Sequence, residues 1–292
     1  MSDKNNQPTY KRQRFLLAFI RQLQNNVSLT DLQKLIFLHE MNKESFNYEF
    51  IPYKYGSYSF KLADDIEILQ RDGFIASAVT ARGNRIRAIG NYKQGSPYTI
   101  ATERGNDLIR KAYREYPYYA INSEILDKIF RGEELRQFKD RKQQYKKAEQ
   151  VLFTIGYEGK SIEAFINALI KNDIRLLCDV RKNPLSRKFG FSKGKLSHIL
   201  DTIGLKYVHI PDLGIESDKR NSLETIKDYK VLFLDYANTL PTRMLFLEFV
   251  NSLLFSNKRI TLMCYEKKAE MCHRHIIRDY LVDNHNIVSV DL

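Results

Sequence analysis

The fold of the second half of the chain is decided by the stretch Leu262-Met-Cys-Tyr-Glu-Lys-Lys-Ala-Glu-Met-Cys-His-Arg274, which lies close to the C-terminus. It continues an apolar run that starts at Ile260, which predicts a buried strand, and it passes through a charged turn into a helix that begins near Cys272. In α/β proteins ligands bind beyond the carboxyl ends of the strands, near helix N-termini whose free amides attract anions. The cysteines, glutamates, histidine and arginine gathered here therefore mark a candidate site.

Apolar strands alternate with helical segments through residues 151–292. The expected strands are residues 151–156, 176–180, 206–210, 260–264 and 287–290. The expected helices are residues 162–172, 195–203, 223–236, 242–255 and 272–283. Such alternation predicts an α/β fold whose parallel sheet is covered by helices on both faces, a Rossmann-like doubly wound sheet. With the strand order 3-2-1-4-5, the first and fourth strands would flank the ligand-binding crevice.

Four motifs of this region lie at or just after the expected strands. They are Thr154-Ile-Gly-Tyr157, Asp179-Val-Arg181 with Pro184 and Ser186-Arg187 after it, Tyr207-x-His-x-Pro-x-Leu-Gly214, and Cys264-x-Glu266 with Cys272-His-Arg274. Together they resemble the DUF488 family over about residues 152–290. The resemblance implies a Rossmann-like domain whose ligand or catalytic pocket is built from these positions. Residues 215–238 depart from the family pattern, so substrate choice is expected to differ here.

The basic residues of these motifs suit a phosphate-bearing ligand. Arg181, Arg187 and Arg274 are expected to converge on one phosphate, because a guanidinium can bind that anion through two parallel hydrogen bonds. Free amides at the start of the last helix would add to this anion site. The expected ligand-binding set is completed by Tyr157, Cys272 and His273.

Two carboxylates and one thiol of this region are candidate catalytic groups. Glu266 or Asp179 can act as nucleophile or general base on a sugar or a base, and carboxylate attack on an anomeric carbon is one way to break a glycosidic bond. Cys264 is a candidate nucleophile, because the arginines and His273 would stabilise its thiolate. The structural alternative is that Asp179 only pairs with an arginine and holds the shape of the pocket, and that the cysteines are small core residues.

Cys264, Cys272 and His273 also form a combination of metal-ligand types. Their spacing, Cys-x7-Cys-His, lacks the paired Cys-x2-Cys of a structural zinc site, and no fourth ligand is evident in the sequence. The chain contains no Gly-x-Gly-x-x-Gly, no Walker-type phosphate loop and no His-Glu-x-x-His. No metal and no cofactor is therefore expected.

The first half of the chain has the element order of a winged helix-turn-helix. Helical periodicity in residues 10–24 is followed by a second helix through Met41, a third that stops at Gly73, and a hairpin. In this fold the third helix enters the major groove and the hairpin, or wing, touches the DNA backbone. The order resembles small bacterial winged-helix modules at Leu32-Gln-Lys-Leu35, Tyr55-Gly-Ser-Tyr-Ser59 and Asp72-Gly-Phe-Ile75.

Basic residues near the expected wing indicate a nucleic-acid contact. Arg82, Arg85 and Arg87 surround its turn. Because Arg85 and Arg87 share one face of a strand, they can follow one phosphate track. Lys54 and Lys61 extend this basic surface along its edge.

The third helix itself carries acidic residues, which argue against simple DNA reading. Asp64, Asp65 and Glu67 would repel phosphates unless they face away from the duplex. The alternative is a winged helix that serves dimerisation or docks a partner protein, so a homodimer is among the expected assemblies.

Length and charge divide the chain into two domains and a connector. A chain of 292 residues exceeds what one core usually supports. The expected parts are a winged-helix domain at residues 1–121, a charged helical linker at 122–150 and an α/β domain at 151–292. The net charge is +12, and residues 1–150 hold 26 basic against 18 acidic residues, which favours a polyanionic partner such as nucleic acid.

No part of the sequence predicts a membrane segment or a secretion signal. The apolar runs fall short of the roughly 20 residues that span a membrane. The N-terminus is polar and lacks the apolar core of a signal peptide. Three cysteines without disulfide spacing predict a reducing, cytoplasmic location.

These observations favour a nucleic-acid-associated protein, with DNA as the expected polymer, whose second domain processes a nucleotide, a base or a sugar-phosphate group. The alternative is a ligand-sensing DNA-binding regulator, in which the same crevice binds a nucleotide-like anion without chemistry. Both readings expect a small phosphate-bearing ligand.

Overall fold

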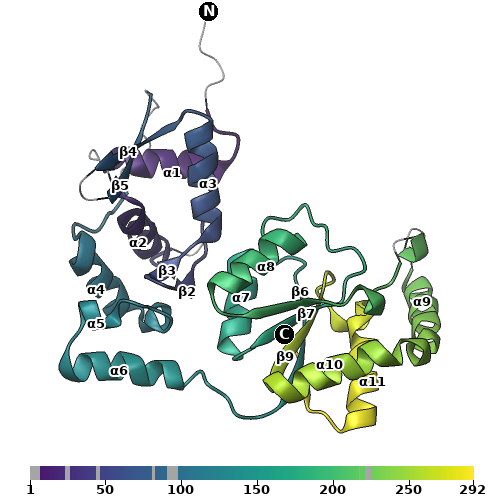
Figure 1. Ribbon diagram of the computed structural model, residues 1–292. Coiled ribbons are helices and arrows are strands. Elements are labelled where there is room, and N and C mark those ends of the chain that lie inside the picture. The colour runs from purple at the N-terminus through teal and green to yellow at the C-terminus, as the bar shows by residue number, and fades with distance from the viewer. Residues whose placement is uncertain are drawn as a thin grey trace, which may run out of the picture. The chain divides into compact units, whose positions relative to one another are not determined.

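The computed structural model describes residues 7–23, 27–43, 47–80, 83–90, 98–216, 218–220 and 225–292. The chain divides into two compact units, Met1–Gln143 and Gln144–Leu292 (Figure 1). None of the helices in the described part of the chain has the length and apolar character that crossing a bilayer demands.

Helices and a small antiparallel sheet form the first unit. Its longer helices are α1 (Lys11–Gln22), α2 (Leu29–Glu40), α3 (Phe60–Arg71) and α4 (Gly105–Glu115). Its strands are β1 (Val27–Ser28), β2 (Ile51–Tyr53), β3 (Gly56–Tyr58), β4 (Ile75–Thr80) and β5 (Gly83–Ala88). One sheet has the order β1-β5-β4, and β2 pairs with β3 between the second and third helices. Ser28 and Ser59 start α2 and α3, because each hydroxyl accepts a hydrogen bond from the backbone N–H three residues later.

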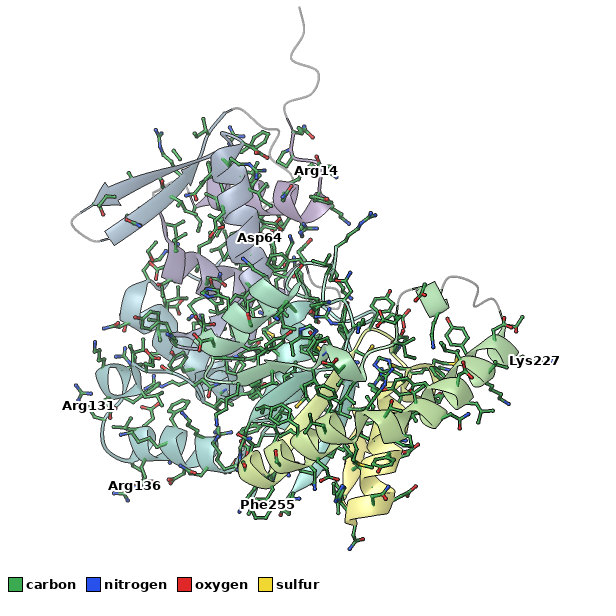
Figure 2. The ribbon with its side chains drawn as sticks, turned by 45° about the vertical axis from the view of Figure 1, so that its right-hand side comes forward. Arg14, Asp64, Arg131, Arg136, Lys227 and Phe255 are labelled. Carbon is green, nitrogen blue, oxygen red and sulfur yellow. The ribbon has the colours of Figure 1, made fainter. Side chains whose placement is uncertain are left out.

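The first unit continues into the segment that was expected to be a charged linker. Helices α5 (Leu126–Ile129) and α6 (Gly132–Gln143) belong to it. Phe138 of α6 is buried, and its ring stacks on that of Phe130 with centroids 4.5 Å apart. Arg131 and Arg136 are exposed at the surface of this unit (Figure 2). The compact unit therefore reaches well past residue 121, because Phe138 and the partly buried Leu135 dock a helix that is otherwise charged.

A parallel sheet forms the centre of the second unit. Its strands are β6 (Val151–Gly156), β7 (Leu176–Asp179), β8 (Lys206–His209), β9 (Arg259–Cys264) and β10 (Ser289–Asp291). They lie in the order β10-β6-β9-β7-β8, and every neighbouring pair is parallel. The mixed α/β class and the parallel sheet expected from the sequence are confirmed.

The expected strand order 3-2-1-4-5 is wrong, because β9 lies between β6 and β7. Every residue of β6 and β9 is buried, which suits strands with a neighbour on each side and helices on both faces. The edge strands β8 and β10 are partly exposed and carry polar residues such as Lys206 and Asp291. β6 and β9, the two strands expected to flank the crevice, are nevertheless paired with each other.

Helices cover both faces of this sheet. They are α7 (Ile162–Lys171), α8 (Lys193–Thr202), α9 (Ile226–Thr239), α10 (Met244–Asn257) and α11 (Arg274–His285). Figure 1 shows α7 and α8 on one face and α10 and α11 on the other. Leu152 and Leu262 of the sheet share a buried apolar cluster with Leu247 of α10 and Leu281 of α11.

The chain leaves β6 and β9 toward opposite faces of the sheet. The segment after β6 leads to α7, and the segment after β9 leads to α11, although Gly156 and Cys264 at their ends are paired neighbours. Neighbouring strands whose connections diverge leave a crevice at their carboxyl ends. Only glycine fits at position 156, because a Cβ atom there would lie 1.8 Å from the backbone oxygen of Glu266. The two segments therefore touch at the base of the crevice.

Candidate functional site

A pocket of about 350 Å³ lies beyond the carboxyl ends of β6, β7 and β9. Its lining includes Tyr157, Arg181, Lys182, Arg187, Cys264 and Tyr265. The sequence motifs after the first, second and fourth strands of the unit thus meet at one place, as expected. Three of these six side chains are basic, so the pocket suits an anion.

Asp179 and Arg181 form a buried ion pair at one side of this pocket. The guanidinium Nε and Nη2 of Arg181 donate to the two carboxylate oxygens at 2.8 and 2.6 Å, and the Arg181 backbone N–H donates at 3.1 Å. Tyr207 donates its hydroxyl to the same carboxylate at 2.7 Å. Asp179 is 0% exposed. This arrangement favours a role in holding Arg181 over the expected role as base or nucleophile, because the carboxylate has no open approach.

Arg181 is itself fixed by further contacts on the pocket wall. Its Nη1 donates to the Tyr157 hydroxyl at 3.0 Å and to the Phe191 carbonyl at 2.9 Å. The Tyr157 ring stacks on Phe191 with centroids 4.3 Å apart. Burial by itself would lower the pKa of Arg181, but hydrogen bonds and charge from Asp179 outweigh it and raise that pKa. Arg181 is therefore a permanent, rigidly placed positive charge.

Arg274 does not belong to this pocket lining. Its guanidinium is 1% exposed and donates to the Thr154 hydroxyl at 3.1 Å and to the carbonyls of Glu266 and Lys267 at 2.6 and 3.1 Å. The expected convergence of three arginines on one phosphate is therefore not found: Arg181 and Arg187 line the pocket, and Arg274 instead secures the segment after β9. An arginine can be buried in this way because its fork of N–H donors is matched by oxygen acceptors.

Lysines that the sequence reasoning missed add positive charge at the same edge of the sheet. Lys160 donates to the Gly156 carbonyl at 3.2 Å, and Lys188 donates to the Tyr157 carbonyl at 2.9 Å. Burial lowers the pKa of Lys160, and the positive charges of Arg274, Lys267 and Lys188 lower it further. Only their position in the sequence could have indicated them, because both lysines follow strands that carry the motifs.

Cys264, Cys272 and His273 form a second cluster, which shares Cys264 with the pocket. The sulfur atoms of Cys264 and Cys272 lie 3.9 and 3.8 Å from Nδ1 of His273, and all three residues are at most 1% exposed. Burial raises the pKa of Cys272 well above its usual value, and the neighbouring Cys264 and Glu266 act in the same direction. Cys272 and His273 thus meet Cys264 rather than the expected phosphate.

The geometry defines a mixed α/β protein with a basic pocket at the carboxyl edge of a parallel sheet. Residues 161–281 match the DUF488 family, which is described as a domain of unknown function. The match runs from the cap of α7 into α11, so it includes the Asp179–Arg181 and Cys264–Arg274 motifs. No curated protein matches the chain, and no solved structure matches it either.

The first unit presents two of its expected nucleic-acid contacts on one strand. Arg85 and Arg87 lie on β5, opposite Ala78 and Ala76 of β4, with the buried Ile86 between them. Their side chains therefore share the face of the hairpin that turns away from the core. Arg82 lies outside the described residues.

Of the three acidic residues of α3, Asp65 is buried, Asp64 is half-buried and Glu67 is exposed. Asp65 is 0% exposed and accepts hydrogen bonds from Arg12 at 2.6 Å and from Gln13 at 2.9 Å. Lys61 forms an ion pair with Asp64 at 2.8 Å, so its charge is partly matched within the helix. Lys54 lies in the turn between β2 and β3, away from β5 along the chain.

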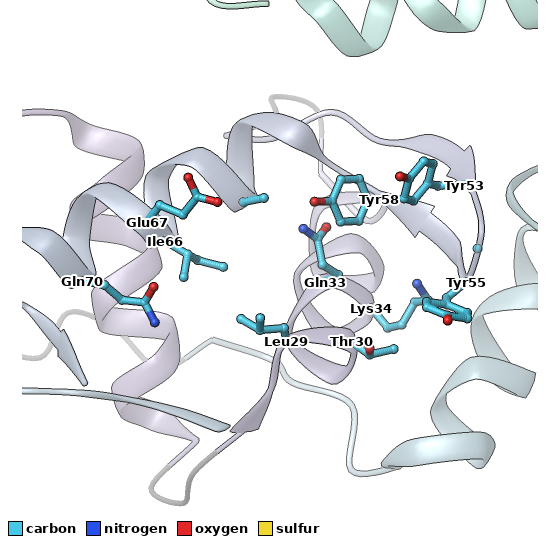
Figure 3. A pocket seen from close by; sticks show the side chains of 12 residues that line it. Leu29, Thr30, Gln33, Lys34, Tyr53, Tyr55, Tyr58, Ile66, Glu67 and Gln70 are labelled. Atoms are coloured by element: carbon cyan, nitrogen blue, oxygen red, sulfur yellow. The ribbon is translucent and has the colours of Figure 1, made fainter. Parts of the chain in front are cut away.

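A hollow of about 370 Å³ lies between α2, α3 and the β2–β3 hairpin (Figure 3). Tyr53, Tyr55 and Tyr58 line it together with Lys34, whose Nζ donates to the Ser57 carbonyl at 2.8 Å. Lys34 is 2% exposed, and burial lowers its pKa to about 7 although Asp31 acts to raise it. In the sequence this lysine is only one residue of the Leu32-Gln-Lys-Leu35 motif, which gives no sign that its side chain is buried.

Proposed function

We propose that this chain is a nucleic-acid-associated protein whose second unit binds a small phosphate-bearing ligand in the pocket beyond β6, β7 and β9. The observation that carries the proposal is the excess of positive charge there. Arg181, Lys182 and Arg187 line the pocket, and Lys160 and Lys188 lie on the segments that frame it. Asp179 balances the charge of Arg181, and Glu216 forms an ion pair with Lys182 at 2.7 Å, so a phosphate group placed there would be attracted chiefly by Arg187, Lys160 and Lys188.

A nucleotide-like ligand is favoured over bare phosphate by the aromatic side of the pocket. Tyr265 is 46% exposed on its lining and meets the Tyr157 ring edge-on with centroids 5.3 Å apart. An exposed ring face can stack on a base while the arginines bind the phosphate. The parallel sheet with helices on both faces and a crevice between β6 and β9 supports a Rossmann-like, doubly wound assignment for this unit.

The first unit is proposed to be a winged helix-turn-helix that binds DNA. Three helices precede the β4–β5 hairpin, and β1 joins that hairpin as a third strand, which is the element order of this fold. Arg85 and Arg87 on the hairpin would contact the phosphate backbone. The burial of Asp65 supports this proposal, because it removes one of the charges that would repel the duplex.

Ligand binding without catalysis is the second candidate, and the state of Asp179 favours it. Its carboxylate accepts hydrogen bonds from Arg181 and Tyr207. Of the two candidate catalytic carboxylates, Asp179 and Glu266, only Glu266 is then left for a catalytic role. In a processing enzyme Glu266 would act on the bound nucleotide or sugar. In a regulator the same pocket would only signal occupancy to the DNA-binding unit.

Loss of Arg187 is expected to weaken phosphate binding about tenfold or more, since a charge-assisted hydrogen bond contributes about 1.5–3 kcal/mol. The measurement is isothermal titration of the full chain with pyrophosphate and a panel of nucleoside monophosphates, comparing wild type with Arg187→Gln. Lys227→Gln on exposed α9 is the matched control and should bind like wild type. Absence of binding by every phosphate probe would contradict the proposal. Chromatography of the same mixtures shows whether a bound nucleotide is converted, which distinguishes an enzyme from a regulator.

Loss of Arg85 and Arg87 together is expected to reduce the salt dependence of DNA binding. Each phosphate contact contributes about 0.9 to the slope of log K against log salt, so the double variant should lose nearly 2. Fluorescence anisotropy with a DNA duplex over a salt series measures this slope. Arg136→Gln, which removes a side chain 73% exposed on α6, is the control. A slope equal to that of wild type would contradict the hairpin contact and favour a protein-docking role.

A further inference from the structure

A buried cluster of two thiols and one imidazole joins the end of β9 to the start of α11. Cys264 is the last residue of β9, and Cys272 and His273 directly precede α11. Their ligand atoms, two Sγ and one His Nδ1 or Nε2, all lie within 4.8 Å of one another. We infer that Cys264, Cys272 and His273 bind one zinc ion, with the fourth coordination position directed to the neighbouring pocket.

The distances between these atoms are close to those of a tetrahedral zinc site. Zinc lies about 2.3 Å from a thiolate and about 2.0–2.1 Å from an imidazole nitrogen, which places ligand atoms about 3.5–3.8 Å apart. The two sulfurs lie 3.9 and 3.8 Å from Nδ1 of His273. These two separations need a contraction of a few tenths of an ångström, and the two sulfurs, which lie within 4.8 Å of each other, would approach to about 3.8 Å by side-chain rotation.

The hydrogen bond on the far side of the imidazole orients His273 for this role. Nε2 lies 3.0 Å from the Val180 carbonyl, which can only accept, so Nε2 carries the proton. The lone pair of Nδ1 is then turned toward the two sulfurs. Metal-bound histidines are usually held in this way, with the second nitrogen donating to a carbonyl or carboxylate. The Tyr236 ring packs edge-on against the imidazole at 5.4 Å and limits its rotation.

The charge of the cluster also suits zinc. Two thiolates and one Zn²⁺ sum to zero, so the occupied cluster is compatible with side chains that are at most 1% exposed. Thiolate and imidazole ligands in a tetrahedral arrangement select zinc over hard cations such as magnesium or calcium. A lone buried cysteine would need no such arrangement, and the third cysteine, Cys178 on β7, lies outside the cluster.

Three protein ligands leave one position for a water or for an atom of a bound molecule, which is the usual layout of catalytic zinc sites. Cys264 belongs both to the cluster and to the lining of the basic pocket, which is the reason for assigning the open position to that side. There the ion would polarise a phosphate or carbonyl oxygen, or lower the pKa of a bound water. Only this use of the fourth position rests on the proposed phosphate ligand; the zinc site does not.

The first experiment measures zinc in the full chain without any phosphate ligand. The protein is exposed to zinc, passed over a weak chelating resin and analysed by inductively coupled plasma mass spectrometry. One zinc per chain is expected for wild type and for the control Cys178→Ala. A loss of most of the metal is expected for Cys264→Ala, Cys272→Ala and His273→Gln. Wild type without zinc, or a control that loses as much as the cluster variants, would overturn the assignment.

A second measurement uses only the wild-type chain, in case the variants fold poorly. Cobalt(II) in place of zinc should show thiolate-to-metal charge-transfer absorption and the intense visible bands of a tetrahedral centre. A weak octahedral spectrum without charge transfer would overturn the inference, as would a Cys264–Cys272 disulfide in protein purified under thiol-free, anaerobic conditions. Because neither measurement includes a phosphate probe, failure here leaves the anion-binding proposal to its own titration.

Discussion

Asp179→Ala is expected to destabilise the second unit by about 3–5 kcal/mol, the usual cost of removing one partner of a buried ion pair. The Arg181 side chain is 5% exposed and would remain charged with no carboxylate beside it. Tyr207 would lose the acceptor of its hydroxyl as well. Urea unfolding followed by circular dichroism measures the change in the free energy of unfolding. Asp201→Ala, at an exposed position of α8, should change it by less than about 0.5 kcal/mol.

A double variant distinguishes loss of the pair from general damage to the sheet. Replacing Asp179 with leucine and Arg181 with methionine removes both charges, and it should recover much of the stability lost in Asp179→Ala. A double variant as unstable as the single one would argue against this account. If Asp179 were catalytic instead, Asp179→Asn would give a stable protein that binds its ligand and does not turn it over.

Lys34→Met is expected to stabilise the first unit at neutral pH and to remove part of its pH dependence. The ammonium is buried, and its pKa falls from 10.5 to about 7 on folding. Between these two values the unfolded chain holds a proton that the folded chain has released, so stability rises with pH across this window. The free-energy cost of burying the Lys34 side chain is largest below pH 7, where it is about 5 kcal/mol for a pKa shift of this size. Methionine has nearly the same length and no charge to bury.

The net gain should be smaller than the full cost, at about 3 kcal/mol, because the Ser57 carbonyl loses the hydrogen bond that it accepts from Lys34. Urea unfolding at pH 6, 7, 8.5 and 9.5 measures the effect for wild type and variant. The wild-type curve should rise more steeply with pH than that of Lys34→Met. Lys11→Met, at an exposed position of α1, should keep the wild-type slope. Equal slopes for wild type and Lys34→Met would show that Lys34 does not titrate in this range.

The elements of the second unit could be predicted because their patterns are strong. The apolar run of β9 and the helix α7 appear in the structure close to where the sequence indicated them. The order of the strands could not be predicted in the same way. Local hydrophobicity shows that a strand is buried on both faces but does not say which strands lie beside it.

The positions of the functional residues could be predicted from the sequence better than their roles. The motif residues meet at the carboxyl edge of the sheet, but the burial of Asp179 and Arg274 argues against the roles expected for them. Arg274 was expected to contact the phosphate of the ligand, and it is instead buried among acceptor oxygens. The spacing of Cys264 and Cys272 argued against a metal, because a loop of seven residues separates them. The fold closes that loop, which sequence spacing alone does not reveal.

The central place of β9 has a consequence for how the second unit is made on the ribosome. β6 and β7 are synthesised early, and β9 must later insert between them, more than 75 residues after β7 along the chain. Until then, both strands expose edges that can pair with other chains. The crevice cannot exist in a nascent chain that ends before residue 259, since its walls come from all three strands. Premature termination in this region would therefore yield a chain that is prone to aggregate and that lacks the site altogether.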